Sequence, residues 1–184
     1  MQNFVYHRVV ENMSGKILYP LNQLKETHPE IYLQHLKKYT GREQILEVKI
    51  PTLNCLWNDV IHFTAVSPYE LLNNLKKGGM KDDSIVWSKW YKIPISLLNL
   101  ENTTVCLYRR DVGLIPSSKD FSNFDPEKME TYRHVPKETI EYYKEQFSNS
   151  KRPLMFHLVP HILYKGTIDT TDLEIIDIQQ GNKS

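Results

Sequence analysis

The sequence predicts an α+β fold, with a few helices packed on a mixed or antiparallel central sheet. Short runs of β-branched and aromatic residues, which are typical of strands, recur along the 184 residues. Only a few helical patterns lie between them, and strands do not alternate with helices as they do in a doubly wound parallel sheet. This length is typical of one domain. We therefore expect a single α+β domain over residues 1–178, followed by a polar C-terminal tail over residues 179–184.

Composition narrows the classes of partner. Lys and Arg number 23 against 22 Asp and Glu, so the formal net charge is +1. Domains that bind duplex nucleic acid are usually strongly basic, so we expect a small anionic ligand or a protein partner instead. No stretch approaches the roughly 20 apolar residues of a membrane span, which predicts no membrane partner. The first residues lack the pattern of a signal peptide, which predicts a cytoplasmic protein and leaves export without a cleaved signal open.

The first third of the chain predicts two strands and a helix between them. Residues 4–10 are β-branched and aromatic, and they predict the opening strand. Residues 27–41 predict a helix, because Pro29 suits the first turn and Gly41 ends a segment with apolar residues at helical spacing. Residues 46–50 alternate between apolar and polar side chains, which predicts a strand ending at Pro51.

The strongest local pattern is a strand that leads directly into a capped helix. Residues 60–66 predict the strand, and Ser67-Pro68-Tyr69-Glu70 follows it. Ser67 at the N-cap, Pro68 at the first helical position and Glu70 three residues after the cap together form a capping box. The helix is expected to end at Gly78-Gly79.

The second half of the chain predicts mainly strands, with two short helical segments among them. The helical segments begin at Asp125 and Val135, and residues 111–125 before them predict a loop. The predicted strands cover residues 85–98, as an edge strand or two pieces broken at Pro94, and residues 103–108, 154–159, 161–164 and 173–178.

The cysteines and one histidine pair predict no metal site. Cys55 and Cys106 are too few for a disulfide scaffold or a cysteine zinc site, and their apolar neighbours predict two buried, reduced thiols. His157 and His161 have the spacing of metal ligands on a helix, but Pro160 excludes a helix interior. On a strand, residues four apart are separated by about 13 Å, too far to share one ion.

Two groups of polar residues are candidates for an anion site. His7 and Arg8 are adjacent on a predicted strand, so one of them should face inward or toward a cleft, where either could hold an anion. A surface arginine beside a hydrogen-bonded histidine is the alternative explanation of the pair. His62 and Thr64 share a strand face, and Ser67 begins a helix whose free N–H groups could receive an anion. A capping role alone also explains Ser67.

Aromatic and basic residues alternate over residues 87–92. Trp87, Trp90 and Tyr91 lie among Lys89 and Lys92, a pattern typical of a surface on which bases stack. An amphipathic edge strand with solvated lysines gives the same pattern. The pair Arg109-Arg110 is a further local basic point.

The order of these features resembles the small ADP-ribosyltransferase-like domains, which include DNA-modifying toxins and RNA 2′-phosphotransferases. The resemblance is carried by Tyr6-His7-Arg8, by residues 59–71 (Asp-Val-Ile-His-Phe-Thr-Ala-Val-Ser-Pro-Tyr-Glu-Leu), and by Leu158-Val159-Pro160 followed by Gly166-Thr167-Ile168. It covers about a third of the chain. It implies an ADP-ribosyltransferase-like fold and NAD as the cofactor, and a fold-level analogy by itself establishes no activity.

The resemblance also implies roles for individual residues. His7 or Arg8 would hold the anionic part of NAD, His62, Thr64 and Ser67 would line the cleft, and Tyr91 or Trp90 would stack on a ring. The toxins carry a catalytic glutamate just before the late apolar strand, where this chain has Arg152-Pro153. Glu174 is the substitute candidate, so the catalytic candidates are Glu174 and His62.

A second hypothesis is a non-enzymatic interaction domain, such as a bacterial effector or an immunity-type protein. The neutral charge, the abundance of Tyr and Trp and the absence of a complete catalytic motif favour it. The two hypotheses predict different surfaces. A transferase requires a deep polar cleft that contains His7, His62 and a carboxylate, whereas an interaction domain requires a convex, exposed aromatic patch.

Overall fold

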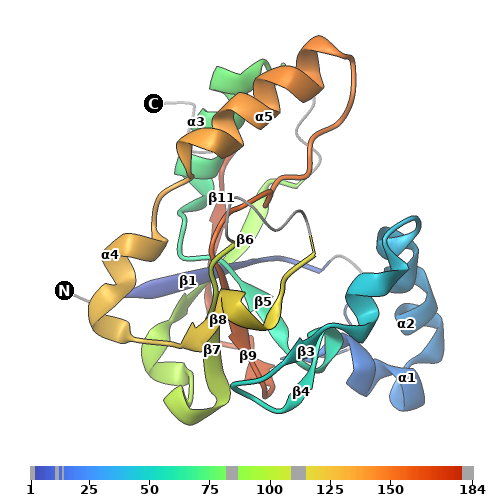
Figure 1. Cartoon of the computed structure of the whole chain (residues 1–184). Helices are drawn as coiled ribbons and strands as arrows, with labels where there is room; N and C mark the ends of the chain where they lie inside the picture. The colour runs from blue at the N-terminus through green and yellow to red at the C-terminus, as the bar shows by residue number, and fades with distance from the viewer. Residues whose placement is uncertain (1–2, 11–12, 14, 82–86, 109–114, 180–184) are drawn as a thin grey trace.

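Two antiparallel sheets form the centre of the molecule, and the helices lie on two sides of them (Figure 1). The computed structural model describes residues 3–10, 13, 15–81, 87–108 and 115–179. This arrangement confirms the predicted α+β class. Residues 180–184 of the predicted tail and the Arg109-Arg110 pair lie outside the described residues. Within the described part of the chain, no helix has the length and apolar character needed to cross a membrane.

The first sheet has four strands in the order β5-β9-β7-β8, and all neighbours are antiparallel. These strands are β5 (Ile61–Phe63), β7 (Thr103–Cys106), β8 (Phe121–Asn123) and β9 (His161–Tyr164). In the register of β5 and β9, His62 lies opposite Leu163. Because side chains alternate along a strand, His161 and Leu163 project from the same face of the sheet as His62.

The second sheet has the order β1-β6-β11, formed by β1 (Phe4–Arg8), β6 (Lys89–Pro94) and β11 (Glu174–Asp177). A bridge between Tyr6 and Thr64 joins β1 to the end of β5, with N···O distances of 2.8 and 3.1 Å. The two sheets therefore meet where the sequence places its two groups of candidate polar residues.

Two small ribbons complete the β-structure. They pair β2 (Ile17–Leu18) with β10 (Ile168–Asp169), and β3 (Lys49–Ile50) with β4 (Cys55–Leu56). These strands are two residues long, so their side chains show too little periodicity for the sequence to reveal them.

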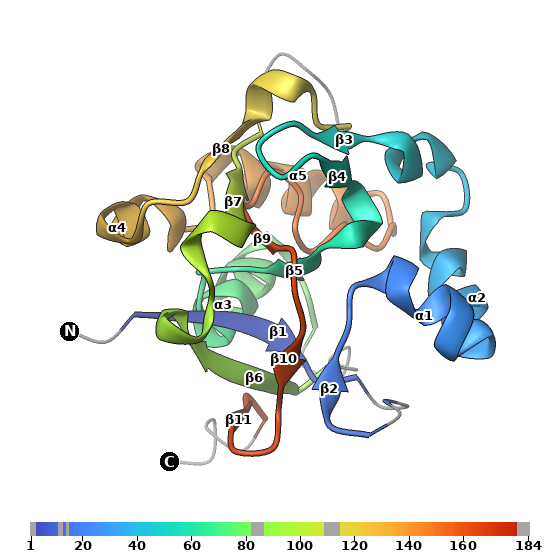
Figure 2. The same cartoon turned by 90° about the horizontal axis from the view of Figure 1, so that it is seen from below.

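The helices form two groups that lie apart in both views (Figures 1 and 2). One group contains α3 (Pro68–Gly78) and α5 (Lys137–Ser148), which pack on each other, and the short α4 (Met129–Tyr132) precedes α5. Gly78 permits the close approach of α3 and α5, because a Cβ at this position would lie 2.5 Å from the Cβ of Tyr143. The other group contains α1 (Leu24–Thr27) and α2 (Pro29–Leu36).

The core consists of three clusters of buried side chains. One cluster fills the space between the two sheets and includes Val5, Phe63 and Ile162. A second lies beneath α3 and α5 and includes Trp90. The third surrounds Trp57 near the α2 side of the molecule. The tryptophans Trp57, Trp87 and Trp90 are 4%, 6% and 1% exposed, so they belong to the core rather than to an outer aromatic patch.

Several predicted strands are wrong. Residues 43–47 form a 3₁₀ turn closed by local hydrogen bonds, which leaves only Lys49–Ile50 of the predicted strand 46–50. Residues 154–159 form turns, with Leu158 at φ = 55°. Residues 115–125 include the strand β8 as well as loop. Residues 85–86 and 111–114 of the predicted elements lie outside the described residues. β6 is the central strand of its sheet rather than an edge. Of the two thiols predicted to be buried, Cys106 is buried and Cys55 is half-buried.

The remaining predictions agree with the structure at the level of whole elements. The opening strand, the helix after Pro29, the capped helix after Ser67 and the two helical segments after Asp125 and Val135 are all present. Strands also occur within residues 60–66, 103–108, 161–164 and 173–178, each shorter than or equal to its predicted range.

Candidate functional site

A cavity of about 680 Å³ opens where the two sheets meet and extends toward α2. Its wall includes His7, His35, His62, His157 and His161, which are five of the seven histidines of the chain. Three cationic residues, Arg8, Lys38 and Arg42, also line it. Among the described lining residues there is no aspartate and no glutamate. The cavity therefore has basic and aromatic character, although the chain as a whole is close to neutral.

Side chains of α5 hold one wall of the cavity, residues 154–158. The Tyr143 hydroxyl donates a hydrogen bond to the carbonyl of Met155, and the Tyr142 hydroxyl accepts one from the backbone N–H of Leu154 at 3.1 Å. Thr139 Oγ1 donates to the carbonyl of His157 at 2.8 Å. These side chains supply the partners that a neighbouring strand would otherwise provide, which explains why the segment forms no strand.

His62 is held by contacts with Trp57. Its Nε2 lies 2.8 Å from the carbonyl oxygen of Trp57, and the two ring centroids are 4.6 Å apart. Burial lowers the pKa of His62 well below 6.5, and the nearby His161 and Lys38 lower it further. His62 is therefore neutral at physiological pH.

His7 and His161 have environments of the same kind. His7 Nδ1 lies 2.6 Å from the carbonyl oxygen of Arg8, and His161 Nδ1 lies 2.8 Å from that of Val159. Burial lowers the pKa of each to about 4. A carbonyl oxygen can only accept a hydrogen bond, so in each neutral ring the bonded nitrogen carries the proton and the other nitrogen carries a lone pair.

Lys38 and Arg42 bring positive charge to the α2 side of the cavity. Arg42 Nη2 donates to the carbonyl of Lys38 at 2.8 Å, and the Lys38 ammonium lies 4.9 Å from the ring centroid of Tyr39. Desolvation, followed by the charge of Arg42, lowers the pKa of Lys38 to about 8. Lys38 still reaches solvent, so the ammonium form prevails at neutral pH. Within the described chain, no carboxylate lies at ion-pair distance from Lys38.

Aromatic rings pack along the cavity between these polar groups. The ring of His161 lies 5.4 Å from Tyr108, 5.9 Å from Phe156 and 6.0 Å from Trp57, measured between centroids. Trp90 and His157 also line the cavity, and Trp90 Nε1 and His157 Nδ1 are buried atoms without a hydrogen-bond partner among the described residues. An apolar wall with a small number of placed polar groups is the usual composition of a ligand pocket.

Four of the predicted site residues line this one cavity. His7, Arg8, His62 and Thr64 come together there through the bridge between β1 and β5. Thr64 is 3% exposed, and its Oγ1 accepts a hydrogen bond from the N–H of Val66 at 3.1 Å.

Three other predicted residues are not among the residues that line the cavity. Tyr91 is part of the core between the sheets, and it is its neighbour Trp90 that lines the cavity. Glu174 lies on β11, where its carboxylate accepts a hydrogen bond from the Lys92 ammonium at 2.8 Å. The side chain of Glu174 is 61% exposed, so this carboxylate faces solvent.

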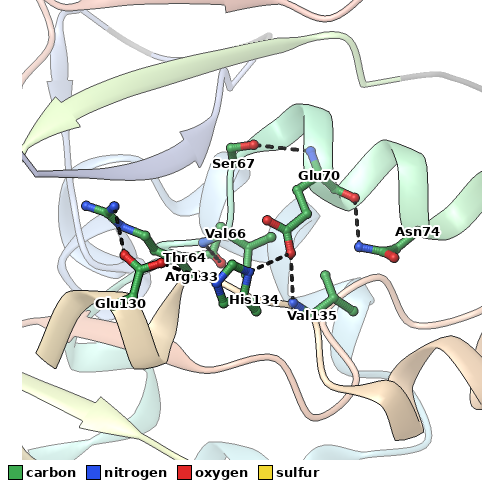
Figure 3. Close-up of polar contacts among 9 residues, drawn as sticks. All are labelled: Thr64, Val66, Ser67, Glu70, Asn74, Glu130, Arg133, His134 and Val135. Carbon is green, nitrogen blue, oxygen red and sulfur yellow. Dashed lines mark hydrogen bonds and ion pairs between the residues drawn. The ribbon is translucent and has the colours of Figure 1, made fainter.

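Ser67, the third of these residues, caps α3 (Figure 3). Its Oγ accepts a hydrogen bond from the N–H of Glu70 at 3.1 Å. The Glu70 carboxylate extends away from Ser67, accepts a hydrogen bond from the N–H of Val135 at 3.2 Å, and lies 3.3 Å from Nδ1 of His134 (Figure 3). This network fixes the start of α3 to the segment between α4 and α5.

The sequence reasoning missed the cationic side of the cavity. His35, Lys38 and Arg42 are spaced by three and four residues, so they form one stripe along α2 and the turns that follow it. This spacing was the available signal. His161 was considered only as a metal ligand. The distance between His157 and His161 was estimated for a strand, but residues 154–159 do not form one. In the described part of the chain, no three His, Cys, Asp or Glu residues are grouped as a metal site would require.

Comparisons with known proteins identify no related protein. No protein-family model matches the chain, and no curated protein or solved structure matches it. The function is therefore argued from the cavity itself.

Proposed function

We propose that the cavity binds a small anionic ligand with a flat ring, and that a nucleotide is the class of ligand it fits best. One observation carries the proposal. A single cavity of about 680 Å³ has two cationic side chains, Lys38 and Arg42, and a wall of aromatic rings. Pockets of about 300–1,000 Å³ are the usual size for ligands of this class.

The electrostatics favour an anion at the α2 side. Lysines and arginines in ion pairs are neutralised by the carboxylates beside them. For Lys38 and Arg42, no carboxylate of the described residues lies at ion-pair distance, and the described lining of the cavity contains no aspartate or glutamate. A phosphate placed near Lys38 and Arg42 would accept charge-assisted hydrogen bonds, which are stronger than bonds between neutral groups. The aromatic side, which includes Trp57 and Phe156, would contact the ring of the same ligand.

Transfer of ADP-ribose from NAD is the narrower prediction, and it requires a carboxylate beside the ribose. Glu174 is bonded to Lys92 outside the residues that line the cavity. We therefore propose nucleotide binding as the function and treat transfer as a separate outcome. Release of nicotinamide from NAD that is lost in Glu174→Gln would support transfer by this glutamate. Binding of NAD without release would leave a binding domain.

The interaction-domain hypothesis predicted a convex, exposed aromatic patch. The three tryptophans are buried, so they do not form such a patch.

Isothermal titration calorimetry with AMP, adenosine and ribose 5-phosphate tests the proposal. We expect AMP to bind and adenosine, which lacks the phosphate, to bind at least about tenfold more weakly. Lys38→Met should weaken AMP binding about 10- to 100-fold, because it removes a hydrogen bond to a charged group. Lys37→Met is the matched control: Lys37 is the preceding residue, is exposed, and does not line the cavity. Absence of AMP binding at millimolar concentration would contradict the proposal.

A further inference from the structure

Three of the five histidines that line the cavity share one arrangement. His7, His62 and His161 each direct one ring nitrogen to a backbone carbonyl oxygen, at 2.6, 2.8 and 2.8 Å. The carbonyls belong to three different segments, so the arrangement is not a consequence of one local turn. Each carbonyl fixes the tautomer of its ring, because it requires a proton on the nitrogen that faces it.

The consequence is a hydrogen-bond acceptor on each ring. The lone pair lies on Nε2 of His7 and of His161, and on Nδ1 of His62. Burial keeps the three rings neutral at physiological pH, so the second nitrogens do not become donors. The cavity thus holds cations, Lys38 and Arg42, together with fixed neutral acceptors on the histidines. A ligand that fits both kinds of group must itself carry an anion and hydrogen-bond donors.

His62 and His161 are the pair placed to act on one group. They project from the same face of the first sheet, their ring centroids are 6.1 Å apart, and the rings are nearly perpendicular, at 88°. Trp57 is adjacent to both, with ring centroids 4.6 and 6.0 Å away. A flat ring lying along this aromatic wall would bring its edge to the two histidines.

We propose that His62 and His161 select a nucleotide whose base carries an exocyclic amino group, with the phosphate at Lys38 and Arg42 and the amino group donating to the histidine nitrogens. This inference rests on the proposed function and names the class of base. An amino group supplies two N–H donors, which matches two acceptors on adjacent rings. A base with hydrogen in place of the amino group leaves both acceptors without a partner, which reduces affinity.

The test compares AMP with purine riboside 5′-monophosphate, which differs from AMP only in lacking the amino group. We expect the wild-type chain to bind AMP about fivefold more tightly or better. His62→Phe keeps a ring beside Trp57 but removes the acceptor, so it should bind the two nucleotides within about twofold of each other. His28→Phe is the matched control, because His28 does not line the cavity, and it should keep the preference.

Nitrogen-15 NMR provides a second test that needs no ligand. Long-range proton–nitrogen correlations at pH 7 should place the lone pair on Nε2 of His7 and His161 and on Nδ1 of His62. The opposite tautomers, or equal affinity of the wild type for the two nucleotides, would overturn the inference and leave nucleotide binding intact. If neither nucleotide binds, the proposed function itself fails, and the inference fails with it.

Discussion

Histidines occur in two regions of this molecule, beside α3 and in the cavity, and the groups that surround them differ. Beside α3, His134 is exposed and lies between two carboxylates, 3.3 Å from Glu70 and 3.4 Å from Glu130. In the cavity, His7, His62 and His161 face backbone carbonyls and have lowered pKa values. The contacts of His134 join structural elements, whereas the environment in the cavity keeps three rings neutral with one fixed acceptor each.

The lysines show the same contrast. Lys92 is bonded to Glu174, and this hydrogen bond raises its pKa. Lys38 has no carboxylate of the described residues at ion-pair distance, and desolvation followed by the charge of Arg42 lowers its pKa. A pair of opposite charges at a surface contributes little to stability. A lysine without a carboxylate beside it can instead hold an anionic ligand, and this is the role that we propose for Lys38.

The largest expected difference between the two regions is in how the free energy of unfolding depends on pH. The unfolded chain binds a proton on each histidine as the pH falls below 6.5, but folded His7 and His161 resist protonation until about pH 4. The free energy of unfolding therefore falls as the pH is lowered through this window. Between pH 7.5 and pH 5 we expect a loss of about 2 kcal/mol for each of the two histidines, and urea unfolding at the two pH values measures it.

A double variant assigns this loss to the cavity. His7→Gln combined with His161→Gln should reduce the loss of stability between pH 7.5 and pH 5 by about 4 kcal/mol. The contribution of His62 should remain, because its pKa is also lowered. A double variant with the full wild-type dependence would show that the cavity histidines are not the neutral groups described above.

The next effect concerns the wall formed by residues 154–158. Tyr143→Phe keeps the ring but leaves the partly buried carbonyl of Met155 without its donor, so we expect a loss of about 1–3 kcal/mol in urea unfolding. Tyr69→Phe is the matched control, because Tyr69 is 42% exposed and should change stability by less than about 0.5 kcal/mol. Equal midpoints for Tyr143→Phe and the wild type would mean that this bond does not hold the wall.

The smallest effect is expected in the network beside α3. Glu70→Gln weakens the contacts with His134 and the N–H of Val135 while an oxygen acceptor remains, so we expect a loss of about 0.5–1 kcal/mol in thermal unfolding. Glu130→Gln, at a side chain that is 73% exposed, should change stability less. The affinity for AMP should be unchanged in both variants. A large change in this affinity would mean that the network beside α3 also takes part in ligand binding.

The sequence predicted those parts of the fold whose local pattern agrees with the final structure. The helix after Ser67 has its N-cap, its proline and its terminal glycine within twelve residues, and it was located correctly. Residues 154–159 have the composition of a strand, but their partners are the side chains of Thr139, Tyr142 and Tyr143 on a helix. No local pattern reports a partner of that kind.

The candidate site could be predicted only in part, for a related reason. His7 and His62 were identified because each lies in a clear strand pattern. Their meeting in one cavity depends on the bridge between Tyr6 and Thr64, a contact between segments far apart in the sequence. Glu174 was chosen for its late position, and the structure places its carboxylate on Lys92 instead of in the cavity.

A crystal structure of the protein with AMP would show directly whether the cavity binds a nucleotide. We expect the phosphate within hydrogen-bond distance of Lys38 or Arg42, and the adenine amino group within hydrogen-bond distance of His62 and His161. AMP bound elsewhere, or an unchanged cavity after soaking at millimolar AMP in crystals that leave its mouth open, would contradict this expectation.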